Sequence, residues 1–154
     1  MEVTEPISRK LIHLAKIYLN VLSKRVDHLG IKRYHYVLSL IQANNGQLTQ
    51  KALAEMLGKD KSALVSIIDF LTEKGYIYRE VNPADRREHL LKATAKAADA
   101  VPEIIAAFDH INQTVTADIT AAEMEVFNNV LLKMEENMKP YADKEFNINL
   151  NLNK

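Results

Sequence analysis

Residues 48–75, LTQKALAEMLGKDKSALVSIIDFLTEKG, decide the fold, because they predict two short helices joined by a tight turn. Thr49 is a good N-cap for a helix over about 50–57, and Gly58 is a natural stop. A second helix is expected from about Ser62 to Gly75. Its buried face follows from apolar residues at positions i, i+3, i+4 and i+7, which are Leu64, Ile67, Ile68 and Leu71. Two short helices with a glycine-containing turn between them predict a helix-turn-helix.

The segment after this pair of helices predicts a β-hairpin. Residues 76–81 (Tyr-Ile-Tyr-Arg-Glu-Val) are rich in β-forming side chains, and residues 88–93 (Glu-His-Leu-Leu-Lys-Ala) follow as a second strand. Between them, Asn82-Pro83 opens a turn with proline at its preferred position. A helix-turn-helix followed directly by a hairpin is a winged helix, and the tip of this wing carries Arg86 and Arg87. Taken alone, the tip also fits a solvated turn with a local ion pair worth about 0–1 kcal/mol.

Amphipathic helices flank the winged helix, so the expected fold class is mainly α with a small β-hairpin wing. One helix is expected over about 6–29 and a shorter one over about 33–45. Two more are expected over about 94–117, capped by Thr94, and from Thr120 or Ala121 to about 139. Because Pro102 interrupts the first of these, we expect a kink or a late start near Asp99. The apolar stripe of the N-terminal helix, which fits a contact with a second subunit or with its own domain, is Ile7, Leu11, Leu14, Tyr18, Leu22, Val26 and Leu29.

The composition narrows the class of protein. The 154 residues suffice for one domain, and 20 basic and 20 acidic residues give a formal net charge of zero, so any nucleic-acid binding must rest on local charge. The absence of cysteine excludes disulfides, thiolate zinc sites and cysteine nucleophiles. Because no secretory signal, membrane span or catalytic motif is visible, we expect a cytoplasmic protein that is not an enzyme. The asparagine-rich residues 146–154 are expected to be a frayed end or an interface arm.

Five short motifs carry a family resemblance. They are Leu48-Thr-Gln-x-x-Leu-Ala, Asp60-Lys-Ser, Leu71-x-x-Lys-Gly, Asp85-Arg-Arg and Leu90-x-x-x-Thr94. Together with the order of helices, they resemble the MarR family of bacterial transcription regulators over about residues 10–138. The resemblance implies a single MarR-like domain over 1–154. Its DNA-binding lobe would span about 31–95, its N- and C-terminal dimerisation helices about 5–29 and 96–140, and its tail 141–154.

The resemblance also implies a function. The protein is expected to be a homodimer that binds a palindromic operator in double-stranded DNA, with half-sites about one helical turn apart. We expect a repressor whose operator affinity is modulated by a small-molecule effector. By the family pattern, Asp85 orients Arg87, which inserts into the minor groove, and Arg86 meets phosphate. A planar, weakly hydrated guanidinium suits the narrow minor groove of A·T-rich DNA.

The predicted recognition helix departs from the family pattern. Ala63 and Ser66 stand where a small polar residue and an arginine are usual, and Phe70 stands where arginine is frequent. The expected DNA-facing side is Ser62, Ala63, Val65, Ser66 and Asp69. Because this side lacks a bidentate guanine reader, it suggests an A·T-leaning site of modest affinity, unless neighbouring helices cover Val65 and Phe70. The rival hypothesis is a winged-helix dimer that has lost operator reading and binds a protein or a ligand.

Further binding residues are expected on neighbouring elements. Phosphate contacts are assigned to the starts of two helices, at Gln50, Lys51, Lys59, Lys61 and Ser62. On helices that line the effector pocket in this family, the candidate ligands are His13, Tyr18, Tyr34, His35 and His110. A small aromatic or anionic effector fits these side chains, although each histidine also fits a structural or surface role. Without cysteine or clustered histidines, no metal or cofactor is expected.

Overall fold

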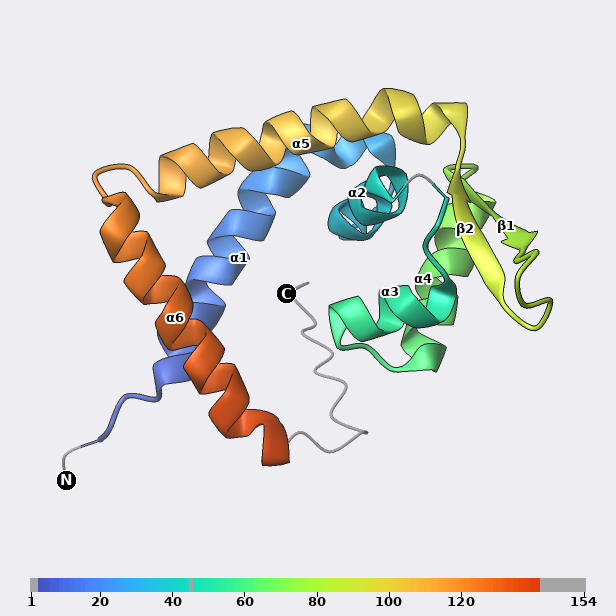
Figure 1. Ribbon diagram of the computed structural model, residues 1–154. Coiled ribbons are helices and arrows are strands. Elements are labelled where there is room, and N and C mark those ends of the chain that lie inside the picture. The colour runs from blue at the N-terminus through green and yellow to red at the C-terminus, as the bar shows by residue number, and fades with distance from the viewer. Residues whose placement is uncertain (1–2, 45, 142–154) are drawn as a thin grey trace. The chain divides into compact units, whose positions relative to one another are not determined.

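The chain divides into two compact units, residues 1–111 and 112–154, and the computed structural model describes residues 3–44 and 46–141 of them. The elements are α1 (Ile7–Val26), η1 (Asp27–Leu29), α2 (His35–Ala43), α3 (Gln50–Leu57), α4 (Lys61–Glu73), β1 (Ile77–Val81), β2 (His89–Ala93), α5 (Ala95–Val115), α6 (Ala121–Met138) and η2 (Lys139–Tyr141) (Figure 1). The mainly α fold with one hairpin is confirmed. Apart from Tyr141, the predicted tail lies outside the described residues.

Local capping determines the bounds of the helix-turn-helix. The Thr49 hydroxyl accepts a hydrogen bond from the backbone amide three residues on at 3.1 Å, and Gly58 ends α3 in the left-handed region, at a φ of 59°. The Asp60 carboxylate caps α4 in the same way at 2.7 Å. Because Asp60 is the cap, α4 begins at Lys61, one residue before the predicted start. The helix predicted over about 33–45 is shorter, at His35–Ala43.

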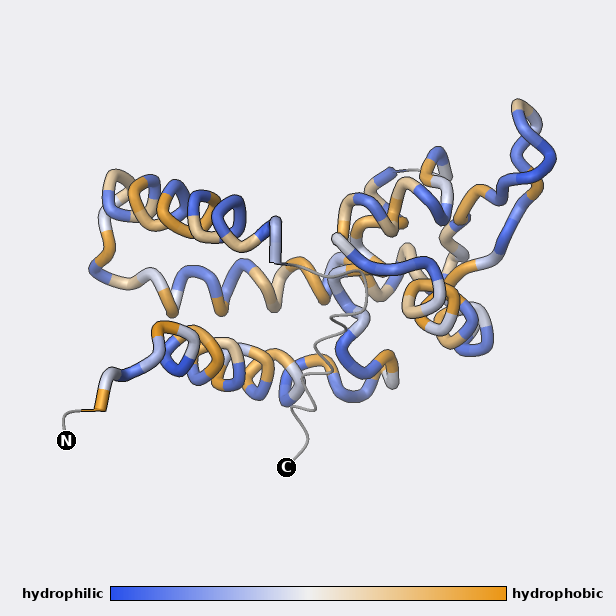
Figure 2. Tube along the Cα trace, turned by 90° about the horizontal axis from the view of Figure 1, so that it is seen from below, coloured by the Kyte–Doolittle hydropathy of each residue, from blue (hydrophilic) through white to orange (hydrophobic). Residues whose placement is uncertain are grey.

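The core of the first unit lies among α2, α3, α4, the hairpin and α5. The predicted inner face of α4 is confirmed, since Leu64, Ile67, Ile68 and Leu71 are all buried. Fully buried side chains from the surrounding elements include Leu38, Ile41, Leu53, Ile77, Leu91 and Ile104. Figure 2 shows hydrophobic and hydrophilic residues alternating along these helices, as amphipathic helices require. Burial of one face of α4 leaves its opposite face to solvent.

The hairpin is tied to the start of α3. Both strands begin one residue later than predicted, and they pair antiparallel with Arg79 opposite Leu91. The other edge of β2 meets the chain before α3, where the Leu91 amide donates to the Leu48 carbonyl at 2.8 Å and Thr49 forms a bridge with Leu90. These contacts hold the N-terminus of α3 beside the wing.

α5 begins at Ala95, so the late start expected near Asp99 is wrong. Thr94 fixes this start, because its hydroxyl accepts from the amide of Ala97 at 3.4 Å and donates to the Gly75 carbonyl at 2.8 Å. Pro102 lies inside the helix, where it removes one backbone hydrogen bond. The helix continues because residues on both sides of the proline are buried in the core, among them Ala100, Val101 and Ile104.

Only the C-terminal end of α1 is buried in the first unit. Leu22 and Val26 pack against α5. Towards the N-terminus the predicted apolar stripe is exposed, with Ile7 69% and Leu14 46% accessible. Packing within the first unit therefore buries the C-terminal end of this stripe, and its N-terminal end stays exposed to solvent.

In the second unit, α6 begins after Thr120, as one of the two predicted starts requires. A capping box closes this end: the Thr120 amide donates to the Glu123 carboxylate at 2.8 Å, and the Glu123 amide donates to the Thr120 hydroxyl at 3.2 Å. No residue of α6 is buried. Its exposed apolar side chains include Val126, Phe127, Val130, Leu132 and Met138.

His35, at the start of α2, is a buried polar residue with 2% of its surface exposed. Within the described part of the chain, neither of its ring nitrogens has a hydrogen-bond partner of normal geometry. Burial lowers the pKa of His35, and the nearby Val26 carbonyl and Asp27 carboxylate only partly oppose this effect. Burial therefore disfavours the charged form of the imidazole in the folded chain.

We predict that the free energy of unfolding falls as the pH is lowered below about 6.5, the ordinary pKa of histidine. The unfolded chain takes up a proton at His35 that the folded chain does not, so acid favours unfolding, by at most about 1.4 kcal/mol per pH unit. Urea denaturation at several pH values measures this slope. His35→Leu should reduce it, whereas His89→Gln, at an exposed histidine, should leave it unchanged. Equal slopes for the wild type and His35→Leu would contradict the prediction.

Candidate nucleic-acid interface

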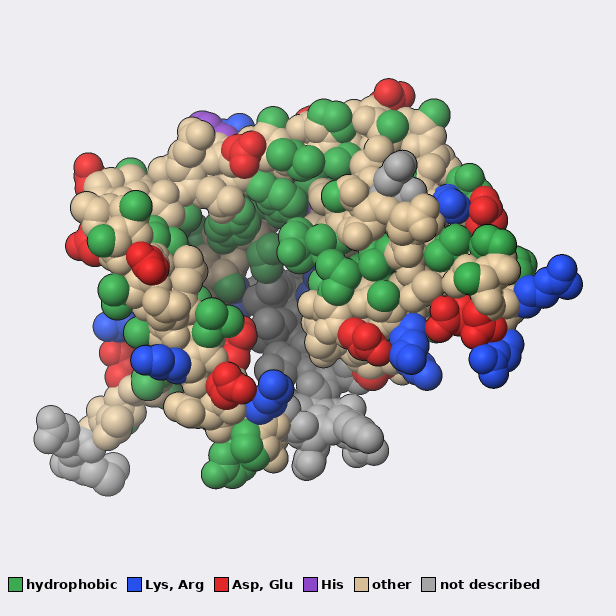
Figure 3. All heavy atoms as spheres, in the orientation of Figure 1, with side chains coloured by type: hydrophobic (Ala, Val, Ile, Leu, Met, Phe, Trp, Pro, Cys, Tyr) green, Lys and Arg blue, Asp and Glu red, His purple; other side chains and the backbone are tan. Residues whose placement is uncertain are grey.

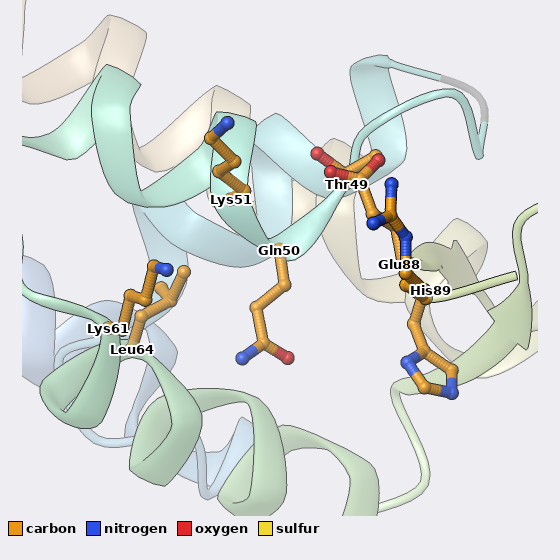
Figure 4. Close-up of a pocket in the computed structure, with 8 residues that line it drawn as sticks. Thr49, Gln50, Lys51, Lys61, Leu64, Glu88 and His89 are labelled. Carbon is orange, nitrogen blue, oxygen red and sulfur yellow. The ribbon is translucent and has the colours of Figure 1, made fainter. Parts of the chain in front are cut away.

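A cleft of about 290 Å³ lies between the start of α3, the first turns of α4 and the wing (Figure 4). Its lining residues are Thr49, Gln50, Lys51, Lys61, Leu64, Arg87, Glu88 and His89. Of the predicted DNA contacts, the cleft brings together Gln50, Lys51, Lys61 and Arg87. Sequence reasoning missed its other four lining residues, which depend on how the wing meets α3.

The charge in this cleft is mainly positive. Lys51, Lys61 and Arg87 line it, against one carboxylate from Glu88. In Figure 4 the Gln50 side chain extends from α3 into the space between α4 and the wing. The N-terminus of α3 adds backbone N–H groups that have no partner within the helix. A helix N-terminus with flanking cations is an arrangement that binds phosphate oxygens.

The tip of the wing is shaped by short-range hydrogen bonds. The Asn82 side chain accepts from the Ala84 amide at 3.0 Å, which forms the bend around Pro83. The Asn82 amide donates to the Glu88 carbonyl, and the Glu88 amide donates to the Asp85 carbonyl, both at 3.0 Å. The tip is therefore a closed turn that holds Asp85 and the arginines in a defined backbone conformation.

Asp85 and Arg87 form a two-pronged ion pair at this tip. The guanidinium Nε donates to Asp85 Oδ1 at 3.0 Å and Nη2 donates to Oδ2 at 2.9 Å, while the Arg87 amide also donates to Oδ1 at 3.0 Å. These hydrogen bonds lower the pKa of Asp85 and raise that of Arg87. The Arg87 side chain is 90% exposed. Figure 3 shows Lys and Arg side chains projecting over the wing, with acidic ones beside them.

The outer face of α4 has little charge. Ser62, Val65, Ser66 and Asp69 are exposed, and Ala63 is half-buried. The Ser62 hydroxyl donates to the Asp60 carboxylate at 2.7 Å, and the Ser66 hydroxyl donates to the Ser62 carbonyl at 3.3 Å. Both hydroxyls are therefore left with acceptor capacity towards solvent. Lys59 and Arg86 are exposed outside the lining of the cleft.

Phe70 is covered by neighbouring side chains, which agrees with the alternative in the sequence analysis that this residue does not face DNA. Its ring packs edge-on against Tyr34 with centroids 5.4 Å apart. Lys32 lies over the same ring at 4.8 Å from its centroid. Val65, by contrast, is 37% exposed and stays on the outer face.

An arginine that the sequence did not single out reaches this face from the wing. Arg79, on β1, donates from Nη2 to Asp69 Oδ1 at 2.6 Å and from Nε to Gln50 Oε1 at 3.4 Å. Through these two hydrogen bonds, Arg79 joins β1 to α3 and to α4, the two helices of the helix-turn-helix. The available signal was a charged residue two positions after Ile77, where strand alternation predicts another inward-facing side chain.

The candidate effector residues lie in different surroundings. His13 lines a cleft along α1 with Glu5, Arg9, Lys10, Ile12 and Lys16, and the other four candidates do not line that cleft. Tyr18 is half-buried, and burial raises its pKa. Tyr34 packs against Phe70, and His35 is buried. His110 is exposed on α5.

Among the described residues there is neither a candidate metal site nor a candidate membrane-spanning helix. Within 3–44 and 46–141, no three His, Cys, Asp or Glu side chains are grouped so as to hold a metal ion. Nor does that part of the chain contain a helix long and apolar enough to span a bilayer.

Comparison with known proteins agrees with this geometry. The model of the MarR family matches residues 31–88, from the end of the first helical segment to the wing. A MarR protein from Peptoclostridium difficile is 22% identical with a TM-score of 0.79, over 92% of this chain and 94% of that one. MarR from E. coli in its reduced form is 26% identical with a TM-score of 0.67, over 86% of this chain and 98% of that one.

One similar structure contains nucleic acid. A putative MarR family transcriptional regulator from Listeria monocytogenes, complexed with 26mer DNA, is 24% identical with a TM-score of 0.76, over 88% of this chain and 90% of that one. The fold, the helix-turn-helix with its wing, and the family match agree. Residues 31–88 match the model of the MarR family, and the chain has the winged-helix fold of these solved MarR structures.

Proposed function

We propose that the protein binds a palindromic operator in double-stranded DNA as a homodimer and represses transcription there, with an operator affinity that a small-molecule effector modulates. In this proposal α4 enters the major groove and the wing inserts Arg87 into the adjacent minor groove. The observation that carries the proposal is the cleft in which Lys51, Lys61 and Arg87 meet. Three cations at one surface suit the phosphate backbone of a duplex.

The wing supports this role through its preformed arginine. The two hydrogen bonds that the Arg87 guanidinium donates to Asp85 fix its plane before any ligand arrives. Because the side chain is almost fully exposed, it reaches beyond the protein surface, as insertion into a groove requires. The Listeria protein that was solved with 26mer DNA has the same fold, which supports DNA as the partner.

The exposed apolar side chains support the homodimer. In the first unit these are on the N-terminal part of α1, and in the second unit they are on α6, where no residue is buried. Single exposed apolar residues are ordinary, but a helix without any buried residue gains little stability from tertiary packing. A second copy of the chain that covers these faces gives α6 that packing.

For the effector, we favour a small aromatic or anionic compound that binds beside His13, the candidate residue that lines a cleft on α1. The cleft beside His13 supports an anion, because Arg9, Lys10 and Lys16 line it against one carboxylate from Glu5. A thermal-shift screen of aromatic acids tests this part of the proposal. His13→Ala should abolish the shift caused by any compound that binds there, and an unchanged shift would place the compound elsewhere.

A second candidate function is a dimeric module that binds a protein or a ligand and no longer reads operators. The observation that favours it is the outer face of α4, where Ser62, Val65 and Ser66 provide neither a cation nor an amide. Titration of the protein against the DNA upstream of its own gene and against a random duplex separates the two functions. The regulator requires selective binding of the upstream DNA, and equal affinity for both duplexes favours the module.

We predict that Arg87→Ala weakens binding to the selected operator by about five- to a hundredfold, because a groove contact of arginine is worth about 1–3 kcal/mol. Asp85→Asn should give a smaller loss, since the arginine stays but loses its charged anchor. Fluorescence anisotropy with labelled operator measures both. Arg86→Ala is the matched control at the same tip and should weaken operator and random duplex alike. Equal behaviour of Arg86→Ala and Arg87→Ala would contradict the assigned roles.

We predict that Lys51→Ala lowers the salt dependence of DNA binding, because loss of one phosphate contact reduces the slope of log K against log salt by about 0.9. The change should be the same for the operator and for a random duplex, since phosphate contacts carry no sequence information. Titrations over a range of salt concentrations measure the slope. Lys133→Ala, at an exposed lysine of α6, is the control and should leave it unchanged. An unchanged slope in Lys51→Ala would remove this residue from the interface.

We predict that Leu14→Glu converts a dimer to a monomer, because a charge buried in an apolar interface without a partner costs several kcal/mol. Light scattering coupled to size-exclusion chromatography measures the mass of the particle. Lys16→Glu changes the charge two residues away on the same helix and should leave the dimer intact. A wild-type chain that is monomeric at micromolar concentration would contradict the dimer.

A further inference from the structure

Arg79 lies where the recognition helix lacks an arginine. Between Lys61 and Lys74, α4 carries no cation, and its exposed charged residues there are Asp69 and Glu73. Arg79 of β1 is bound to the Asp69 carboxylate at 2.6 Å. A guanidinium is therefore present beside the outer face of α4, although the helix itself does not supply it.

The position of Arg79 in the hairpin explains how it reaches this face. Arg79 stands opposite Leu91, which is fully buried, and two positions after the buried Ile77. Residues paired across two antiparallel strands share one side of the sheet, so Arg79 starts from the inner side of the wing. Its guanidinium reaches Asp69 of α4, and 28% of the side chain stays exposed.

Two anchors from different elements hold the guanidinium. Asp69 accepts from Nη2, and Gln50 accepts from Nε at 3.4 Å. Gln50 itself lines the cleft between α3, α4 and the wing. Arginine has five N–H donors, and two of them make these hydrogen bonds, so three remain, on Nη1 and Nη2. One of the remaining donors on Nη1 and the one on Nη2 lie in the plane of the guanidinium and can pair with two acceptors.

Such a pair has a specific counterpart in DNA. Guanine presents two acceptors, O6 and N7, side by side in the major groove, and a bidentate arginine is the commonest side chain that reads them. An arginine that is already held in one plane loses less conformational freedom on binding than a free one. Asp69, 60% exposed, adds an acceptor next to these donors. An acceptor of this kind matches the N4 amino group of the paired cytosine.

We propose that Arg79 is the guanine-reading residue of each operator half-site, and that Asp69 and Gln50 are its positioning residues. This inference rests on the proposed binding of operator DNA. It specifies one base pair that each half-site of the operator should contain. The sequence suggested an A·T-leaning site because α4 offers no guanine reader. With Arg79 at the edge of α4, the half-site contains a G·C pair for the major groove as well as A·T-rich DNA for Arg87 in the minor groove.

The test is selection of binding sites from a library of random duplexes by the wild type and by Arg79→Lys. The wild type should select a palindrome with a preferred G·C pair in each half-site. Arg79→Lys keeps the positive charge but loses the planar fork, so the preference at that pair should fall by about five- to a hundredfold. Arg25→Lys is the matched control, because it makes the same exchange at an exposed arginine of α1 that has no assigned contact with DNA, and it should select the wild-type palindrome.

Asp69→Asn tests the positioning role. The amide keeps the shape of the side chain and removes the charge that holds Arg79, so selectivity at the same G·C pair should fall in part and the other positions should not change. Thermal melting of each variant, together with its affinity for a random duplex, reports on folding. If Asp69→Asn weakens all positions equally, the pair is a structural tie between β1 and α4, and the inference is overturned.

Failure of the inference and failure of the proposed function have different results. If the wild type selects a palindrome and Arg79→Lys selects the same one, Arg79 does not read guanine, although the protein binds an operator. A lower melting temperature of Arg79→Lys with an unchanged palindrome has the same meaning. If the wild type selects no sequence at all, operator binding itself is wrong, and the inference is overturned with it.

Discussion

The pairing of β2 with the segment before α3 is the interaction on which the candidate interface depends. The hydrogen bond from the Leu91 amide to the Leu48 carbonyl and the bridge between Thr49 and Leu90 hold the N-terminus of α3 against the wing. An isolated hairpin is marginally stable in water, so β2 gains from a second neighbour and from the buried Leu91 side chain. Strand β2 therefore connects the start of α3, which lines the cleft, to the wing and to Arg79 on the paired strand β1.

Features that depend on residues close in sequence were predicted correctly. The caps Thr49 and Thr94 and the buried face of α4 follow from local hydrogen bonding and helical periodicity. The late start of α5 was wrong, because the cost of Pro102 is local whereas the burial that offsets it comes from distant elements. Strand register, and with it the contact of Arg79 with Asp69, also depends on residues far along the chain.

The same distinction applies to the interface. Asp85 and Arg87 are two residues apart, so their pairing follows from a motif of three residues. Glu88 and His89 line the cleft only because the wing folds back towards α3, and neither was predicted. Phe70 stands where the family often has arginine, and the structure uses it to pack α4 against Tyr34. The position that would carry a cation towards DNA thus stabilises the helix-turn-helix instead.

A net charge of zero has a physical consequence for the proposed function. Two arginines at the candidate interface are bound to aspartates, Arg79 to Asp69 and Arg87 to Asp85. The aspartates reduce the long-range attraction to phosphate that drives non-specific binding, because they cancel charge that would otherwise release counterions. They also fix the planes of the two guanidinium groups, which favours ligands with matching acceptors. A regulator competes with a large excess of non-specific DNA, so weaker general attraction together with fixed donors raises the ratio of specific to non-specific binding.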